Sequence, residues 1–88
     1  MVTTKLRILR HQYGISLKEL ERYCHYSYQY LSDLDLGKIR RTPKNENTLN
    51  AAMTALIASR REQLTALERA YQTCCGQLLQ AMEVEADV

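Results

Sequence analysis

The chain has 88 residues, which suits one domain with a modest core. Its three Gly and one Pro favour helices over strands joined by tight turns. It has no apolar run of about 18 residues and no apolar signal-peptide core near the N-terminus, so we expect a cytoplasmic protein without a membrane segment.

The net charge of +2 hides an uneven distribution along the chain. Residues 1–44 carry nine Lys or Arg and four Asp or Glu, a net charge of +5. Residues 45–88 carry three basic and six acidic residues, a net charge of −3. This asymmetry indicates that the N-terminal part of the chain meets a polyanion.

The first predicted helix covers about residues 5–13. Thr4 can cap it, and Leu6, Leu9 and Tyr13 share one face. A second helix is predicted over about 17–24. Ser16 and Glu19 before and within it have the spacing of a capping box, in which the Glu carboxylate returns to the N-cap amide.

A third helix is predicted over about residues 28–36. Ser27 is a candidate N-cap, and Leu31 and Leu34 would face inward. Gly37 is the natural end, because glycine takes the left-handed conformation without steric cost. Two short helices joined by a turn of three or four residues form a helix-turn-helix pattern.

Residues 6–57 resemble the DNA-binding domain of the phage-repressor (Cro/cI, or XRE) family. The resemblance is carried by three segments, namely Leu6-Arg7-x-Leu9-Arg10, Gly14-Ile15-Ser16-x-x-Glu19-Leu20 and Ser27-x-x-x-Leu31-Ser32-x-Leu34-Asp35-x-Gly37-Lys38. The chain departs from the family at Glu21, where Ala is usual, and at His25, where Gly is usual. We therefore expect Glu21 to point partly outward and His25 to adopt turn geometry that suits Gly.

The resemblance implies a four-helix repressor-type domain, residues 1–58, within an all-α fold. Residues 59–88, which the resemblance does not cover, are predicted from their own pattern to continue as a long C-terminal helix that serves as a dimerisation or interaction segment. The resemblance also implies a largely covered ion pair between Arg10 and Asp35, whose role would be to orient the fold.

The outer side of the third helix holds the candidate base-contacting residues, which by the resemblance face the major groove: Tyr28, Gln29, Ser32 and Asp33. Gln29 can form a bidentate pair with adenine, and Asp33 can accept from a cytosine amino group. Tyr28 can bond a phosphate or pack on a thymine methyl group. The alternative for Gln29 and Asp33 is a solvated polar face.

Candidate phosphate contacts flank this helix. Lys38, Arg40, Arg41 and Lys44 form the densest basic segment of the chain, and we expect it to run as a loop along the DNA backbone. Ser27 and Lys18 complete the set. In the family, the first residue of the second helix is often a Gln that contacts phosphate; here that residue is Leu17, and Lys18 can make the contact instead. A merely solvated loop is the alternative.

A long helix is predicted from about residue 47 to 84, capped by Asn45 or Asn47. Its first part should close the core through Leu49, Ala52, Met53, Leu56 and Ile57. Beyond Ser59, a seam with heptad spacing is formed by Leu64, Leu67, Tyr71, Cys74, Leu78 and Ala81. This seam favours dimerisation, with folding back onto the domain as the alternative, and Gly76 is a point where the helix can break.

The sequence thus predicts a sequence-specific double-stranded-DNA-binding regulator, a repressor acting as a homodimer on an inverted repeat. The alternative is a protein-interaction module, like an antitoxin or antirepressor, that binds its partner through the C-terminal helix. Three cysteines lack metal-ligand spacing, His11 and His25 are isolated, and no catalytic constellation is present. We expect no enzymatic activity, metal or cofactor.

Overall fold

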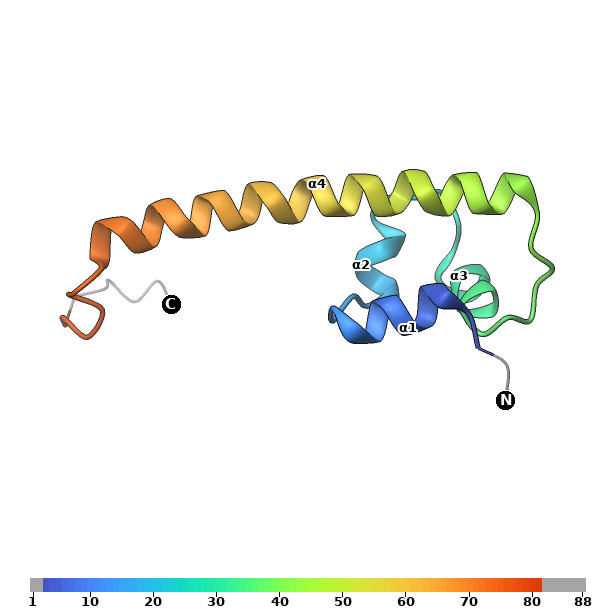
Figure 1. Cartoon of the computed structure of the whole chain (residues 1–88), viewed down its shortest axis with the longest axis horizontal. Helices are drawn as coiled ribbons and strands as arrows, with labels where there is room; N and C mark the ends of the chain where they lie inside the picture. Colours follow the sequence, from blue (N-terminus) through green and yellow to red (C-terminus); the bar gives the residue numbers. More distant parts are fainter. Residues whose placement is uncertain (1–2, 82–88) are drawn as a thin grey trace, which may run out of the picture.

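The computed structural model describes residues 3–81, and within that range it is all-helical, as predicted. The elements are α1 (Lys5–Gln12), α2 (Leu17–Glu21), α3 (Tyr28–Asp35) and α4 (Pro43–Cys74). The three short helices gather on one side of the first half of α4, and the rest of α4 projects away from them (Figure 1). The molecule is therefore elongated, with extents of 54 × 29 × 26 Å.

Short polar side chains start the first three helices. The hydroxyls of Thr4, Ser16 and Ser27 each accept a hydrogen bond from the amide three residues later. Each bond satisfies one first-turn amide that has no partner inside the helix. The predicted starts of these helices are confirmed.

The predicted start of the long helix was wrong. Thr42 caps α4, Pro43 is its first residue, and Asn45 lies one turn inside rather than before it. The Thr42 amide donates to Asn45 Oδ1 at 2.8 Å, and the Asn45 amide donates to Thr42 Oγ1 at 3.2 Å. This reciprocal pair is a capping box, and Pro suits the first helical position because its missing N–H has no partner there.

All four helices end earlier than predicted, α2 and α4 by the most. α2 stops at Glu21, because the amides of Arg22 and Tyr23 bond carbonyls three residues back, which tightens the last turn. α4 stops at Cys74, before Gly76, which has a φ of +85°. Leu78 and Ala81 therefore lie past the helix, and Val84 lies outside the described residues. α3 ends at Asp35, one residue early, and Gly37 has the expected left-handed conformation, with a φ of +78°.

The core lies between α2, α3 and the first half of α4. It is made of five buried apolar residues, Ile15, Leu20, Leu31, Ala52 and Leu56. Leu49 and Met53 pack against it while staying partly exposed. Ile57, predicted to belong to the core, is 48% exposed instead, because the core-facing stripe of α4 runs through Ala52 and Leu56.

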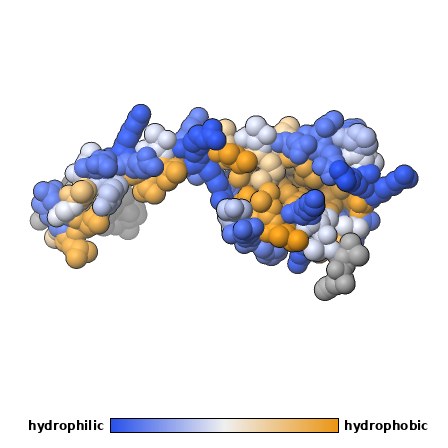
Figure 2. Space-filling view, in the orientation of Figure 1, coloured by the Kyte–Doolittle hydropathy of each residue, from blue (hydrophilic) through white to orange (hydrophobic). Residues whose placement is uncertain are grey.

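The last part of α4, residues 61–74, is here called the protruding half. Every residue from 61 to 73 is exposed, and the segment continues straight out of the domain (Figure 1). The alternative in which it folds back onto its own domain is therefore not what the chain adopts. Apolar side chains recur along it (Figure 2).

No helix within residues 3–81 combines the length and apolar character needed to cross a membrane.

Candidate nucleic-acid interface

The four candidate base-contacting residues lie on α3. Leu31 and Leu34 lie on the buried face of this helix, with exposed fractions of 0% and 8%. Tyr28 and Gln29 are exposed in its first turn, and Ser32 and Asp33 follow one turn later, half-buried. The helix therefore presents a polar face on which Tyr28 and Gln29 are exposed, Tyr28 by 45%.

Gln29 and Asp33 are joined on this face. Gln29 Nε2 donates to Asp33 Oδ1 at 3.2 Å, a contact between residues four apart on one helix. The bond leaves Gln29 with Oε1 and one N–H, which is the pair of groups that adenine N6 and N7 require. Asp33 is thus placed to position Gln29, in addition to its predicted contact with cytosine.

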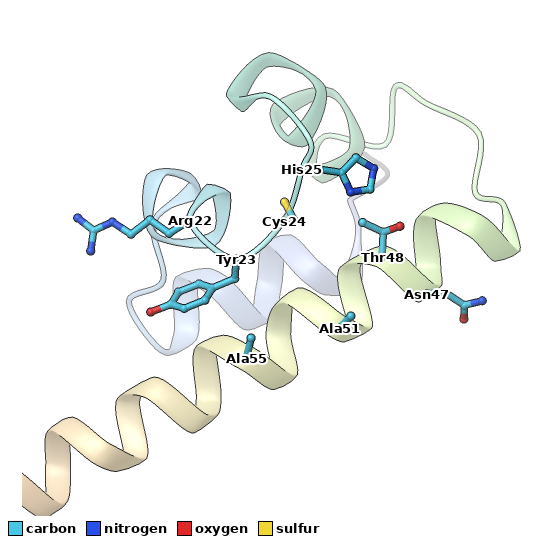
Figure 3. Close-up of a pocket in the computed structure, with 8 residues that line it drawn as sticks. All are labelled: Arg22, Tyr23, Cys24, His25, Asn47, Thr48, Ala51 and Ala55. Atoms are coloured by element: carbon cyan, nitrogen blue, oxygen red, sulfur yellow. The ribbon is translucent and has the colours of Figure 1, made fainter.

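The basic residues flank α3. The helix lies between α2, which carries Lys18, and the segment of residues 38–42, called here the basic segment (Figures 1 and 3). Lys18, Lys38, Arg40, Arg41 and Lys44 are all exposed. Lys44 was predicted in the loop but lies in the first turn of α4, because that helix begins at Pro43. Ser27 is exposed, and its Oγ accepts from the Tyr30 amide, which leaves its own proton to donate.

Asn45 anchors the basic segment, a role that the sequence analysis missed. It is 4% exposed and donates from Nδ2 to the Arg40 carbonyl at 3.1 Å, in addition to its reciprocal hydrogen bonds with Thr42. At the other end, the Lys38 amide donates to the Asp33 carbonyl at 2.9 Å. The segment is therefore tied to α3 and α4 at its two ends. The pattern Thr-Pro-x-Asn could have identified this start of α4.

Arg41 also pairs with Glu46, with 3.0 Å between Nε and Oε1. The Arg41 side chain is 84% exposed, and such exposed pairs contribute little to stability. A phosphate can therefore compete with Glu46 for the guanidinium.

A buried ion pair fixes the end of α3 against α1. Arg10 Nε donates to Asp35 Oδ1 at 2.9 Å, and Arg10 Nη2 donates to Oδ2 at 2.6 Å. Arg10 Nη1 donates to the Ile15 carbonyl at 2.7 Å, and Thr4 Oγ1 donates to the Asp35 carbonyl at 2.7 Å. The hydrogen bond to Asp35 raises the pKa of Arg10. The Arg10–Asp35 pair is present, as the sequence analysis expected, and it sets the orientation of α3.

A second cation near this carboxylate is Arg7, whose Nη1 lies 3.6 Å from Asp35 Oδ2. Arg7 is more exposed than Arg10, with 40% of its side chain accessible. It supports the pair from the solvent side.

Glu19 does not complete the predicted capping box. Ser16 Oγ accepts from the Glu19 amide, but the Glu19 carboxylate binds Arg60 of α4. Hydrogen bonding to Arg60 lowers the pKa of Glu19, and the same contact raises the pKa of Arg60. Arg60 also donates to the carbonyls of Tyr13 and Gly14 at 3.0 and 3.2 Å. This residue, absent from the sequence-based candidates, fastens α4 to the corner between α1 and α2.

The last residue of α2, Glu21, and the turn that follows it, with His25, carry the two departures from the repressor pattern. His25 does not take left-handed geometry, since no non-glycine residue among those described has a positive φ. Glu21 is half-buried, in line with the expected partly outward position. Aromatic rings from this turn and from α3 pack in tilted pairs, with centroids 4.7 Å apart for His25–Tyr26 and 4.6 Å apart for Tyr26–Tyr30.

A shallow hollow separates this turn from α4. Cys24 and His25 line it from the turn, His25 lies beside Thr48, and Tyr23 lies toward Ala55 (Figure 3). Cys24 is a free, half-buried thiol. Within residues 3–81, His, Cys, Asp and Glu side chains nowhere gather in a group of three that could hold a metal ion.

The predicted seam occupies the protruding half, except for Leu78 and Ala81. Leu64, Leu67 and Tyr71 are 55%, 65% and 47% exposed. Cys74 is half-buried at the end of α4, and its Sγ donates to the Ala70 carbonyl at 3.3 Å. Leu78 and Ala81 were placed on the seam wrongly, because α4 ends before them at Cys74.

Comparison with protein-family models, with curated proteins and with solved structures gave no match to this chain. The functional interpretation therefore depends on the geometry of α2, α3, the basic segment and the protruding half.

Proposed function

We propose that this chain is a sequence-specific double-stranded-DNA-binding protein in which α2 and α3 form the helix-turn-helix unit of a repressor-type domain. The observation that carries this proposal is the arrangement around α3: a polar helix face with exposed basic residues on both of its flanks, of which those in the basic segment are held by hydrogen bonds to α3 and α4. A major groove accepts one α-helix, and the phosphates on either side of it meet whatever flanks that helix.

The chemistry of the side chains divides them into residues that contact phosphates and residues that contact bases. Lys18, Lys38, Arg40, Arg41 and Lys44 bind phosphates and set the docking register, with Ser27 donating a hydrogen bond from the start of α3. Gln29 contacts a base, and the Tyr28, Ser32 and Asp33 side chains complete the groove-facing surface. Phosphate contacts supply affinity, whereas contacts to base edges supply sequence preference.

Rigid placement supports this function. The Arg10–Asp35 pair fixes one end of α3, and Asn45 fixes the basic segment next to it. A groove-facing helix held by buried contacts loses less conformational freedom when it binds DNA. This arrangement performs binding rather than catalysis.

The protruding half supports a homodimer. Leu64, Leu67 and Tyr71 lie exposed on one stripe that its own domain does not cover. A two-fold dimer would present two copies of α3 to an inverted repeat, with half-sites one helical turn or a multiple apart. Such a dimer on an operator acts as a transcriptional repressor, the activity that the resemblance implies.

The test is a salt titration with a matched control. If Arg40 and Arg41 bind phosphates, the Arg40→Ala, Arg41→Ala double variant should weaken binding to random and preferred duplexes equally. The slope of log affinity against log salt should also fall by about 0.9 for each phosphate that the variant no longer neutralises. The Arg61→Ala, Arg69→Ala double variant removes the same charge from the protruding half and should keep the slope. Equal slopes for the two variants would contradict the interface.

The exposed stripe also favours a second candidate, a module that binds another protein through α4, as an antitoxin or antirepressor does. In that case the chain alone stays monomeric, and the stripe is covered by a different polypeptide. Sedimentation of the purified chain separates the two candidates.

A further inference from the structure

The seam on α4 begins well before Leu64. Counting back from Leu64 with the same alternation of three and four residues gives positions 60, 57, 53 and 50. All of them belong to one unbroken helix, Pro43–Cys74, so the seam positions from 50 to 74 share one face. Ile57 and Met53 are apolar, and Ile57 is 48% exposed, so the chain's own core leaves much of this side chain in solvent.

Arg60 lies on this seam without placing a free charge in it. Its guanidinium is turned to Glu19, with contacts of 2.8 and 2.7 Å to the two carboxylate oxygens. Only the aliphatic stem of Arg60 is then available to a partner, and such stems pack well on apolar surface. The seam is therefore continuous from Asn50 to Cys74.

The length of the seam matters for stability of a dimer. The stretch from Leu64 to Cys74 is about 16 Å long at 1.5 Å per residue. A specific interface buries roughly 1,000 Å² or more, so a longer seam favours a stable dimer. From Asn50 to Cys74 the helix is about 37 Å long, which more than doubles the length available for contact.

We propose that a second copy of this chain packs along Asn50–Cys74 of α4 in the antiparallel direction. Met53 then lies opposite Tyr71 of the second copy, Ile57 opposite Leu67, and Arg60 opposite Leu64. The seam has two rows of residues, one at positions 50, 57, 64 and 71 and one at positions 53, 60, 67 and 74. Each pair joins a residue of one row to a residue of the other row, as antiparallel helix packing requires. The proposal rests on the homodimer of the proposed function and specifies its direction and register.

A hollow next to the seam accommodates the end of the second helix. It measures about 720 Å³ and lies between α1 and the first turns of α4, with Leu6, Leu9, Leu49 and Met53 among its lining residues. The same region shows apolar surface between α1 and α4 in the space-filling view (Figure 2). In the proposed register, Tyr71 and Cys74 of the second copy reach this hollow, so the protruding half of each chain covers the domain of the other.

Charge favours the antiparallel direction. A parallel pair would set the +5 half of one chain beside the +5 half of the other. The antiparallel pair instead sets each basic half beside residues 45–81 of the other chain, in which three basic and three acidic residues balance. Like charges across an interface oppose the wrong orientation, so the parallel pair is disfavoured.

Native Cys74 provides the test. In a chain with Cys24→Ser and Cys75→Ser, Cys74 is the one thiol. Adding Asn50→Cys places a second thiol at an exposed position opposite Cys74 of the other copy. A disulfide needs Cα atoms within about 7 Å, so oxidation should convert most of this variant to a covalent dimer. Glu62→Cys in the same background, away from the seam, is the matched control and should stay largely uncrosslinked. Circular dichroism checks that each variant keeps its helices.

Two other outcomes overturn the proposed direction or register but are compatible with a dimer, and a third overturns the dimer. Dimerisation of the Cys74-only chain by oxidation means a parallel pair. Crosslinking by Leu64→Cys in the same background, without crosslinking by Asn50→Cys, means a shorter antiparallel seam. Monomer by sedimentation before oxidation overturns the dimer itself, while DNA binding is measured separately.

Discussion

Arg60 and Glu19 are 41 residues apart in sequence, and their side chains form a two-pronged ion pair, Nε to Oε1 at 2.8 Å and Nη2 to Oε2 at 2.7 Å. Arg60 also binds the carbonyls of Tyr13 and Gly14, just after α1. One side chain thus holds the protruding helix, the end of α1 and the start of α2. The direction in which α4 leaves the domain depends on this contact.

Removing Arg60 should cost more than removing its neighbour. We expect Arg60→Gln to lower the free energy of unfolding by about 1 kcal/mol, because the pair is partly exposed but has ideal two-pronged geometry. Arg61→Gln removes the same charge from a side chain that forms no ion pair within residues 3–81 and should cost less than about 0.5 kcal/mol. Urea unfolding of both variants measures the difference, and equal losses would contradict the role of Arg60.

The same pair makes stability depend on pH. Arg60 lowers the pKa of Glu19, so the folded state binds this proton less readily than the unfolded chain. The stabilisation is present above the ordinary Glu value of about 4.3 and is lost as pH falls through the lower folded pKa. Glu19→Gln should therefore flatten the acid side of the stability profile below about pH 5. An unchanged profile between about pH 5 and 2.5 would contradict this assignment.

The Arg10–Asp35 pair should be far more sensitive to substitution. Asp35 is 1% exposed, so Asp35→Ala leaves the Arg10 guanidinium buried without its carboxylate. We expect a loss of about 3–5 kcal/mol, a large part of the stability of a domain this size. Thermal unfolding by circular dichroism measures it. A loss similar to that of Glu46→Ala, which breaks an exposed pair, would show that the buried pair does not hold the fold.

The starts of α1, α2 and α3 were predictable because each depends on residues that are close together in sequence. Thr4, Ser16 and Ser27 each meet an amide three residues away. The start of α4 was missed because Asn45 and Asn47 were weighed as caps, whereas Thr42 and Pro43 already satisfy every requirement of a helix start. The early end of α2 depends on a local tightening of its last turn that apolar spacing does not encode.

For the candidate interface, the sequence predicted which residues are present more fully than the contacts that hold them in place. The repressor resemblance supplied the Arg10–Asp35 pair and the outward residues of α3. The Arg60–Glu19 contact could not be predicted, because it joins residues 41 positions apart and Glu19 already fitted a local capping box. The exposure of Ile57 likewise depends on which side of α4 meets α2 and α3.

Gln29 should determine preference at one base position. We expect Gln29→Ala to cost about 1–3 kcal/mol on the preferred duplex and little on random DNA. Asp33→Ala removes the acceptor that orients the Gln29 amide and should reduce discrimination at the same base position, in part. Competition titrations against duplexes changed at single positions test both. Full discrimination by Gln29→Ala would show that Gln29 does not face the groove.

New charges introduced on the seam of the protruding half should dissociate the dimer. Leu64→Asp with Leu67→Asp places two carboxylates on the seam and should give a folded monomer that binds operator DNA weakly. Leu78→Asp is the control, because Leu78 lies past the end of α4 and should leave the dimer intact. Sedimentation at tens of micromolar, about tenfold above a micromolar dissociation constant, decides the result. A wild-type chain that is monomeric there would contradict the dimer.

Selection of bound sequences from a random double-stranded DNA pool tests the central claim most directly. A sequence-specific dimer predicts enrichment of an inverted repeat with fixed half-site spacing, and the same pool selected with Gln29→Ala should lose preference at one position in each half-site. Enrichment of no sequence, at a salt concentration where the wild-type chain still binds duplex DNA, would contradict sequence-specific recognition by α3.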